Sequence, residues 1–134
     1  MIKIQIDFIS KSIGPFELGN NISDYISIYP NKFNKGKDEW DEFLFFDEDI
    51  EVYVDLKNEI TAIACRNSCF AGDLNLIGLG INEFIKTYNF NINKIKSEKL
   101  WVSDHEQQDV YSFDEFDLQL WTDSNKKIVT VFLG

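Results

Sequence analysis

The side chains of this sequence that are best suited to binding or catalysis are carboxylates. Most of the carboxylates lie in two stretches. Residues 38–55 contain nine carboxylates and residues 103–123 contain seven, with no Lys or Arg in either stretch. Crowded carboxylates can hold a hard cation, act as general acid and base, or present a charged surface to a basic partner. Each of these uses places its own demand on spacing.

The spacing does not fit a metal-binding loop. Asp47-Glu48-Asp49 and Asp114-Glu115 are consecutive, whereas an EF-hand loop needs alternate ligands, a central Gly and a terminal Glu. A glycosidase-like pair is defined by the distance between two carboxyl groups in space, and the sequence singles out no such pair. We therefore expect no metal, no cofactor and no enzymatic activity.

The single histidine and the two cysteines do not suggest a nucleophilic site. His105 lies in the polar segment 103–108, which we expect to be an exposed loop. Cys65 and Cys69 lack the second pair of ligands that a zinc site needs. In the absence of an export signal, we expect both to be free thiols that fill buried space. The glycines of LIGLG, residues 76–80, lack the Lys-Ser/Thr ending of a phosphate-binding loop.

The chain as a whole is strongly acidic. It carries 23 Asp and Glu against 13 Lys and Arg, of which Arg66 is the only arginine, and its formal net charge is −10. Phosphate backbones and anionic membranes attract basic surfaces, so we expect neither nucleic acid nor membrane as a partner. A basic protein is favoured, because opposite charges raise the rate of encounter.

Length and composition indicate one domain, residues 1–134. With 44% apolar residues, the chain can close a core without disulfides. No apolar run approaches the length of a membrane-spanning helix. The N-terminal residues MIKIQIDFIS alternate apolar and polar positions, which is typical of a first strand and not of a signal peptide. We therefore expect neither a signal peptide nor a membrane anchor.

The sequence repeats itself in its helical segments. Residues 21–29 and 80–88 align with a constant offset of 59, and in both the apolar residues fall at i, i+3, i+4 and i+7. This spacing predicts two short amphipathic helices. Asn21 and Gly80 are the expected N-caps, and Pro30 should end the first helix.

The similarity continues in strand-like segments at an offset of 68. Residues 50–55 and 60–64 align with 118–123 and 128–132, and polar turns of hairpin length separate the members of each pair. The pseudo-repeats, about 14–66 and 74–134, therefore each read as helix, variable acidic segment and hairpin. The predicted fold class is α+β: two helix-plus-hairpin repeats that form one antiparallel sheet with the helices packed on one face.

The paired elements GPFELGNNISDYI and NLIGLGINEFI, each followed by an acidic segment and a hairpin, resemble the small tandem-repeat immunity proteins of bacterial polymorphic toxin and contact-dependent growth inhibition systems. In layout the chain is also similar to the β-lactamase inhibitor protein class, in which two such repeats form one concave sheet. The resemblance covers residues 14–134. It implies a cytoplasmic inhibitor that binds one cognate toxin, possibly a nuclease with a basic substrate-binding surface.

If the protein is such an inhibitor, carboxylates and an aromatic anchor should meet the partner. The expected partner-binding residues are Trp40, Asp41, Glu42, Asp47, Glu48 and Asp49 in the first half and Asp104, Asp109, Asp114 and Glu115 in the second. Three alternatives stay open. The protein could be an acidic adaptor with a non-toxin partner, or it could be an acid/base or metal-dependent enzyme. The acids could also simply form the solvated face of a sheet. The oligomeric state is open as well.

Overall fold

Eight antiparallel strands form the main sheet of the computed structural model, which describes residues 3–36 and 40–134. Their spatial order is β10-β11-β12-β13-β7-β6-β5-β4. The strands are β4 (Asn31–Asn34), β5 (Asp41–Phe45), β6 (Ile50–Val54), β7 (Ile60–Cys65), β10 (Lys96–Ser103), β11 (Glu106–Phe113), β12 (Leu118–Thr122) and β13 (Ile128–Leu133). Each half of the chain thus supplies four consecutive strands, and β7 pairs with β13 where the halves meet.

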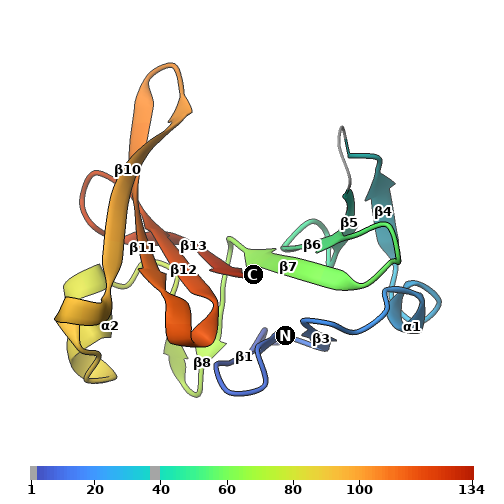
Figure 1. The fold of residues 1–134 in the computed structure, drawn as a ribbon, viewed down its shortest axis with the longest axis horizontal. Coiled ribbons are helices and arrows are strands. Elements are labelled where there is room, and N and C mark those ends of the chain that lie inside the picture. The colour runs from blue at the N-terminus through green and yellow to red at the C-terminus, as the bar shows by residue number, and fades with distance from the viewer. Residues whose placement is uncertain (1–2, 37–39) are drawn as a thin grey trace.

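The remaining elements are short and lie on one side of the main sheet (Figure 1). They are the helices α1 (Ser23–Ile26) and α2 (Ile81–Thr87), the 3-10 turns η1 (Ile92–Lys94) and η2 (Asp114–Phe116), and the short strands β1 (Ile6–Asp7), β2 (Ser12–Ile13), β3 (Phe16–Glu17), β8 (Phe70–Ala71) and β9 (Leu74–Asn75). Within the described ranges, no helix has the length and apolar character to cross a membrane.

Strand alternation explains which face of the sheet is covered. In β6, Ile50, Val52 and Val54 are buried, while Glu51 and Tyr53 between them are only partly buried. The buried side chains join one apolar cluster with Tyr25 of α1 and Phe84 of α2. The helices and short strands therefore pack against a single face of the main sheet.

The opposite face is concave. In Figure 1 the β10–β11 hairpin and the β4–β5 hairpin rise at the two ends of the sheet, away from the helices, and β7 and β13 lie between them. Register shifts at Tyr53/Val54 and at Trp121/Thr122 interrupt the two central hairpins. Such bulges bend a strand and increase its twist, which is consistent with the curvature.

The antiparallel sheet expected from the sequence is confirmed, and its strands are more numerous than expected. Each helix is followed by four strands of the main sheet instead of one hairpin, because the segments between each helix and its expected hairpin form β4 and β5 in the first half and β10 and β11 in the second. The expected N-terminal strand is reduced to the two residues of β1, and residues 1–2 lie outside the described ranges. Helix α1 is also short, with four residues and Ile22 as its N-cap, whereas Gly80 is the N-cap of α2 as expected.

Two tight turns tie the central hairpins to the starts of the helices. Asp55 Oδ1 accepts hydrogen bonds from the backbone N–H groups of Lys57 and Glu59, at 2.9 and 3.0 Å. Asp123 Oδ1 accepts equivalent bonds from Asn125 and Lys127, also at 2.9 and 3.0 Å. The turns then accept hydrogen bonds from the N–H groups of Ile22 and Ile81, one at the start of each helix.

We predict that Asp55→Ala and Asp123→Ala each lower the free energy of unfolding by about 1–2 kcal/mol, since each removes two hydrogen bonds to backbone N–H groups. Chemical denaturation measures the loss. Asp55→Asn is the matched control, because it removes the charge but keeps an oxygen acceptor, and it should lose less. Equal losses in the alanine and asparagine variants would show that charge, and not the turn, is responsible.

Candidate protein-interaction face

The face of the main sheet that the helices leave uncovered is the candidate site. Residues paired across neighbouring strands point to the same face, so the strand register identifies its members. We call this set the open face. On strands β5, β6, β7, β13, β12 and β11 it consists of Glu42, Leu44, Glu51, Tyr53, Ala62, Ala64, Thr130, Phe132, Gln119, Trp121, Val110 and Ser112. Ala64 and Val110 are buried but do not belong to the main core cluster, in agreement with this assignment.

Two aromatic side chains stand on either side of a low centre on the open face. Ala62 and Ala64 of β7 leave little side-chain bulk there, with Phe132 beside them on β13. On one side the Tyr53 hydroxyl donates to Glu51 Oε2 at 2.6 Å. On the other side Trp121 Nε1 faces Gln119 Oε1 at 3.4 Å. The open face thus carries an aromatic residue with a polar neighbour in each half of the chain.

Trp40 adds a third aromatic group and closes a small pocket. Its ring centroid lies 5.2 Å from that of Tyr53, with the rings edge to face, and Trp40 remains 46% exposed. A hollow of about 260 Å³ is lined by Trp40, Tyr53, Thr61, Ala62 and Phe132. We call it the Trp40 pocket. Large aromatic side chains around a hollow are the kind of anchor that protein interfaces use.

The negative charge of the open face gathers beside Tyr53. Glu51 accepts the Tyr53 hydroxyl and forms an ion pair with Arg66. Glu42 accepts a hydrogen bond from Asn34 Nδ2 at 3.1 Å. Burial, then the hydrogen bond to Glu51 and the charges of Glu51 and Glu42, raise the pKa of Tyr53 above its ordinary value. The corresponding side of the other half has Gln119 and Val110, which are uncharged.

The ten residues expected at an interface lie in several separate places. Trp40 and Glu42 lie beside Tyr53, whereas Asp41 accepts a hydrogen bond from the backbone of Gly36 at 3.2 Å. Asp104 lies in the exposed turn between β10 and β11. The others are in the β5–β6 turn (Asp47, Glu48, Asp49), in η2 (Asp114, Glu115) and on the opposite face of β11 (Asp109).

Several of these carboxylates already have partners within the chain. Glu48 pairs with Lys32 at 3.6 Å and Asp114 with Lys96 at 2.9 Å. Asp109 pairs with Lys99 at 3.1 Å and with Lys126 at 3.8 Å. Asp49 accepts a hydrogen bond from Asn67. Exposed ion pairs of this kind stabilise a protein little, because solvent screens them, and they reduce the charge offered to a partner.

Sequence reasoning missed Glu51, Tyr53 and Phe132 as site residues. The alternation in residues 50–54 does place Glu51 and Tyr53 on one face. Phe132, however, reaches their neighbourhood only through the pairing of β13 with β7, which joins residues far apart in the sequence. Periodicity assigns a face within a strand, but it does not reveal which strands are neighbours.

The single histidine and the two cysteines lie away from the open face or are buried. His105 is exposed in the β10–β11 turn. Cys65 and Cys69 are buried free thiols, and the Cys65 Sγ lies 2.8 Å from the carbonyl oxygen of Ser68. The hydrogen bond with Cys65 and burial raise the pKa of Cys69. In the described part of the chain, no three His, Cys, Asp or Glu side chains cluster as metal ligands would.

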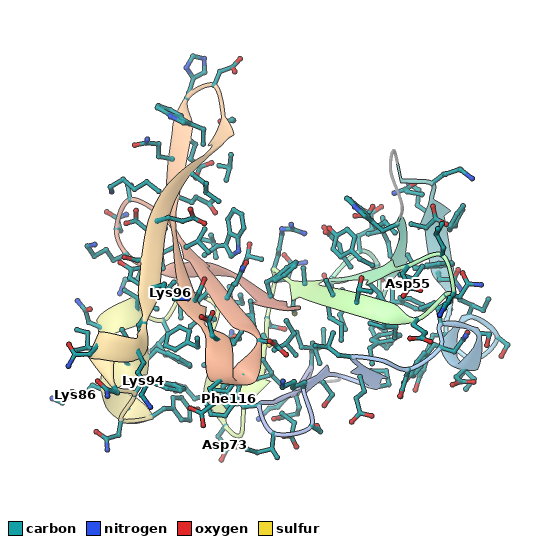
Figure 2. The ribbon with its side chains drawn as sticks, viewed as in Figure 1. Asp55, Asp73, Lys86, Lys94, Lys96 and Phe116 are labelled. Atoms are coloured by element: carbon teal, nitrogen blue, oxygen red, sulfur yellow. The ribbon has the colours of Figure 1, made fainter. Side chains whose placement is uncertain are left out.

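A second hollow lies on the helix side of the sheet. It measures about 520 Å³, and Tyr88, Phe90 and Phe116 are among its lining residues. Figure 2 shows Phe116 on this side together with Lys86, Lys94 and Asp73. The hollow borders the core aromatic cluster, in which the Phe90 and Phe113 ring centroids are 4.8 Å apart. We call it the helix-side hollow.

No protein-family model matches the chain, and no curated protein or solved structure matches it. The interpretation of the open face therefore rests on its geometry and its charge.

The raised pKa of Tyr53 predicts a specific loss of stability at alkaline pH. The folded protein keeps this proton where the unfolded chain, with a tyrosine pKa of about 10, loses it. The associated stabilisation is complete below about pH 10 and declines as the pH rises further. Urea unfolding across this range should show a steeper decline for the wild type than for Tyr53→Phe. Parallel declines would contradict the assigned environment of Tyr53.

Proposed function

We propose that this protein is a non-enzymatic acidic inhibitor, an immunity protein, that binds and neutralises a cognate basic bacterial toxin through the open face. The observation that carries the proposal is a concave sheet face left uncovered by the helices, with Trp40, Tyr53 and Trp121 on or beside it. Exposed or half-exposed Trp and Tyr are enriched where proteins bind one another, because they bury much area at little conformational cost.

The charge supports a basic partner. A net charge of −10 creates a long-range field that speeds the approach of a positively charged protein. Three exposed acids, Glu98, Asp104 and Glu106, lie on the β10–β11 hairpin that borders the concave side. A nuclease has a basic surface that binds the phosphate backbone of its substrate, so an acidic protein can occupy that surface in place of the substrate. A cytoplasmic location belongs to the same proposal.

We further propose that the two halves of the chain are related structural units. Three backbone hydrogen bonds of the first half recur in the second half. The residue numbers differ by 59 for the residues that lead into the helix and by 68 for the residues of the hairpin turn. Gly19 N–H donates to Ile60 O, as Gly78 N–H does to Ile128 O. Ile60 N–H donates to Asn20 O, as Ile128 N–H does to Leu79 O. Ile22 N–H donates to Asn58 O, as Ile81 N–H does to Lys126 O. Gly19 and Gly78 also share a positive φ, 92° and 91°, which glycine adopts without strain. These matches support a duplicated unit in which the paired halves build one sheet.

The direct test of function is co-expression with the product of the neighbouring upstream reading frame. We expect that product alone to stop growth, and the pair to grow and to co-elute on a sizing column. Co-elution with a harmless neighbour would favour the adaptor function instead. A harmless neighbour that does not co-elute would contradict the immunity function.

Neutralising the hairpin acids should weaken the complex with that partner. We expect Glu98→Gln, Asp104→Asn and Glu106→Gln together to slow association several-fold and to reduce the salt dependence of the affinity, because charges at an interface rim act mainly on encounter. Association rates at several salt concentrations measure both effects.

The matched control neutralises three exposed acids on helix-side elements, Asp24, Asp73 and Glu83, by the same changes. It has the same net charge as the hairpin triple variant, so its association rate should fall less. If the two triple variants are equally slow, total charge alone is responsible and the open face is not favoured as the docking surface.

A further inference from the structure

We propose that the partner anchors itself to the open face by one cationic side chain, preferentially an arginine, that enters the Trp40 pocket. This inference rests on the proposed function, since it names the chemistry of the group that the same surface receives. It is carried by three features of the pocket: its apolar floor, its aromatic wall and the carboxylates beside it.

The floor and side of the pocket suit the aliphatic stem of a long side chain. Ala62 contributes only a methyl group, and Phe132 of the neighbouring strand borders it. The hollow of about 260 Å³ is small, so it fits a single side chain and not a folded element of a partner. Arginine and lysine commonly bury their methylene groups against apolar surface while the charged end stays near polar groups.

The aromatic wall suits the charged end. Trp40 and Tyr53 lie edge to face with their centroids 5.2 Å apart, and Trp40 remains 46% exposed. An exposed indole attracts a cation through its π face, and the planar guanidinium of arginine also stacks on it. This geometry favours arginine over lysine.

Two carboxylates complete the site at the edge of Tyr53. Glu51 Oε2 accepts a hydrogen bond from the Tyr53 hydroxyl at 2.6 Å, and Glu42 lies directly opposite Tyr53 on the neighbouring strand. Glu51 also binds the guanidinium of Arg66 within this chain. Glu51 therefore already receives one guanidinium, and an arginine from a partner would meet the same chemistry.

The other half of the open face provides an internal comparison. Trp121 and Gln119 stand where Tyr53 and Glu51 stand in the first half, and Val110 corresponds to Glu42 at the same offset of 68. That side has the aromatic group without a carboxylate next to it on this face of β11 or β12, and Glu98 of β10 lies one strand further, beyond Val110. A cation should therefore prefer the Trp40 side, and substitutions around Trp121 serve as matched controls.

The inference can be tested on the isolated full chain. The probe is a blocked pentapeptide with one arginine among glycines, and nuclear magnetic resonance follows the indole N–H of Trp40 and the methyl group of Ala62. We expect saturable shifts at both groups. A peptide with citrulline, the neutral isostere of arginine, should bind about tenfold more weakly or not at all.

Four variants locate the binding. Trp40→Ala and Glu42→Gln should each weaken arginine-peptide binding about five- to tenfold, whereas Trp121→Ala should change it less than twofold. Arg66→Gln should strengthen it, because Glu51 then loses its internal cation. Shifts of equal size around Trp121, an equal affinity for the citrulline peptide, or no saturable binding would overturn the inference.

The failure of this inference can be told apart from failure of the proposed function. If the co-expressed partner is neutralised and Trp40→Ala and Glu42→Gln bind it as tightly as the wild type, the pocket is not the anchor although the protein is an inhibitor. If the arginine peptide binds as expected and the neighbouring product is harmless and does not co-elute, the pocket stands and the immunity function fails.

Discussion

The pairing of β7 with β13 is the interaction on which the rest of the structure depends. Three residue pairs, Val131 with Cys65, Phe132 with Ala64 and Leu133 with Ile63, join the two four-stranded halves into one sheet. The outer two pairs are fully buried in the core, and the middle pair lies on the open face. A shift of one residue in this register would exchange the two faces, so the same short contact fixes both the core and the candidate site.

The sequence predicts the centre of this fold well and its periphery poorly. Buried and half-buried residues alternate strictly in 50–54 and 118–122, and polar turns follow both segments, so these hairpins were expected. Strands β4 and β10 were not expected, because they lie at the two edges of the sheet and most of their side chains are exposed. An edge strand with one solvated side and charged residues lacks the apolar period that identifies a strand. The candidate site was predicted only in part for a related reason: Trp40 and Glu42 are local to one acidic stretch, while Phe132 joins them through long-range pairing.

Charge and shape contribute differently to the proposed binding. The carboxylates are spread over turns, hairpin tips and both faces of the sheet, and several are paired with lysines. They set the long-range field more than they define a contact surface. In the proposed complex the concave side of the sheet is the contact surface, and we expect its aromatic groups to hold the partner tightly. The combination of Glu42, Glu51 and Tyr53 is the place where the two contributions coincide.

The most direct test of the central claim is to locate the partner on the sheet by methyl resonances in the purified complex. Ala62 and Leu44 project from the open face and are partly exposed, whereas Ile63 and Val131 project into the core and Ile95 lines the helix-side hollow. The account predicts intermolecular contacts and large shifts at Ala62 and Leu44, with small changes at Ile63, Val131 and Ile95. Contacts confined to Ile95 and its surroundings, with Ala62 and Leu44 unchanged, would contradict it.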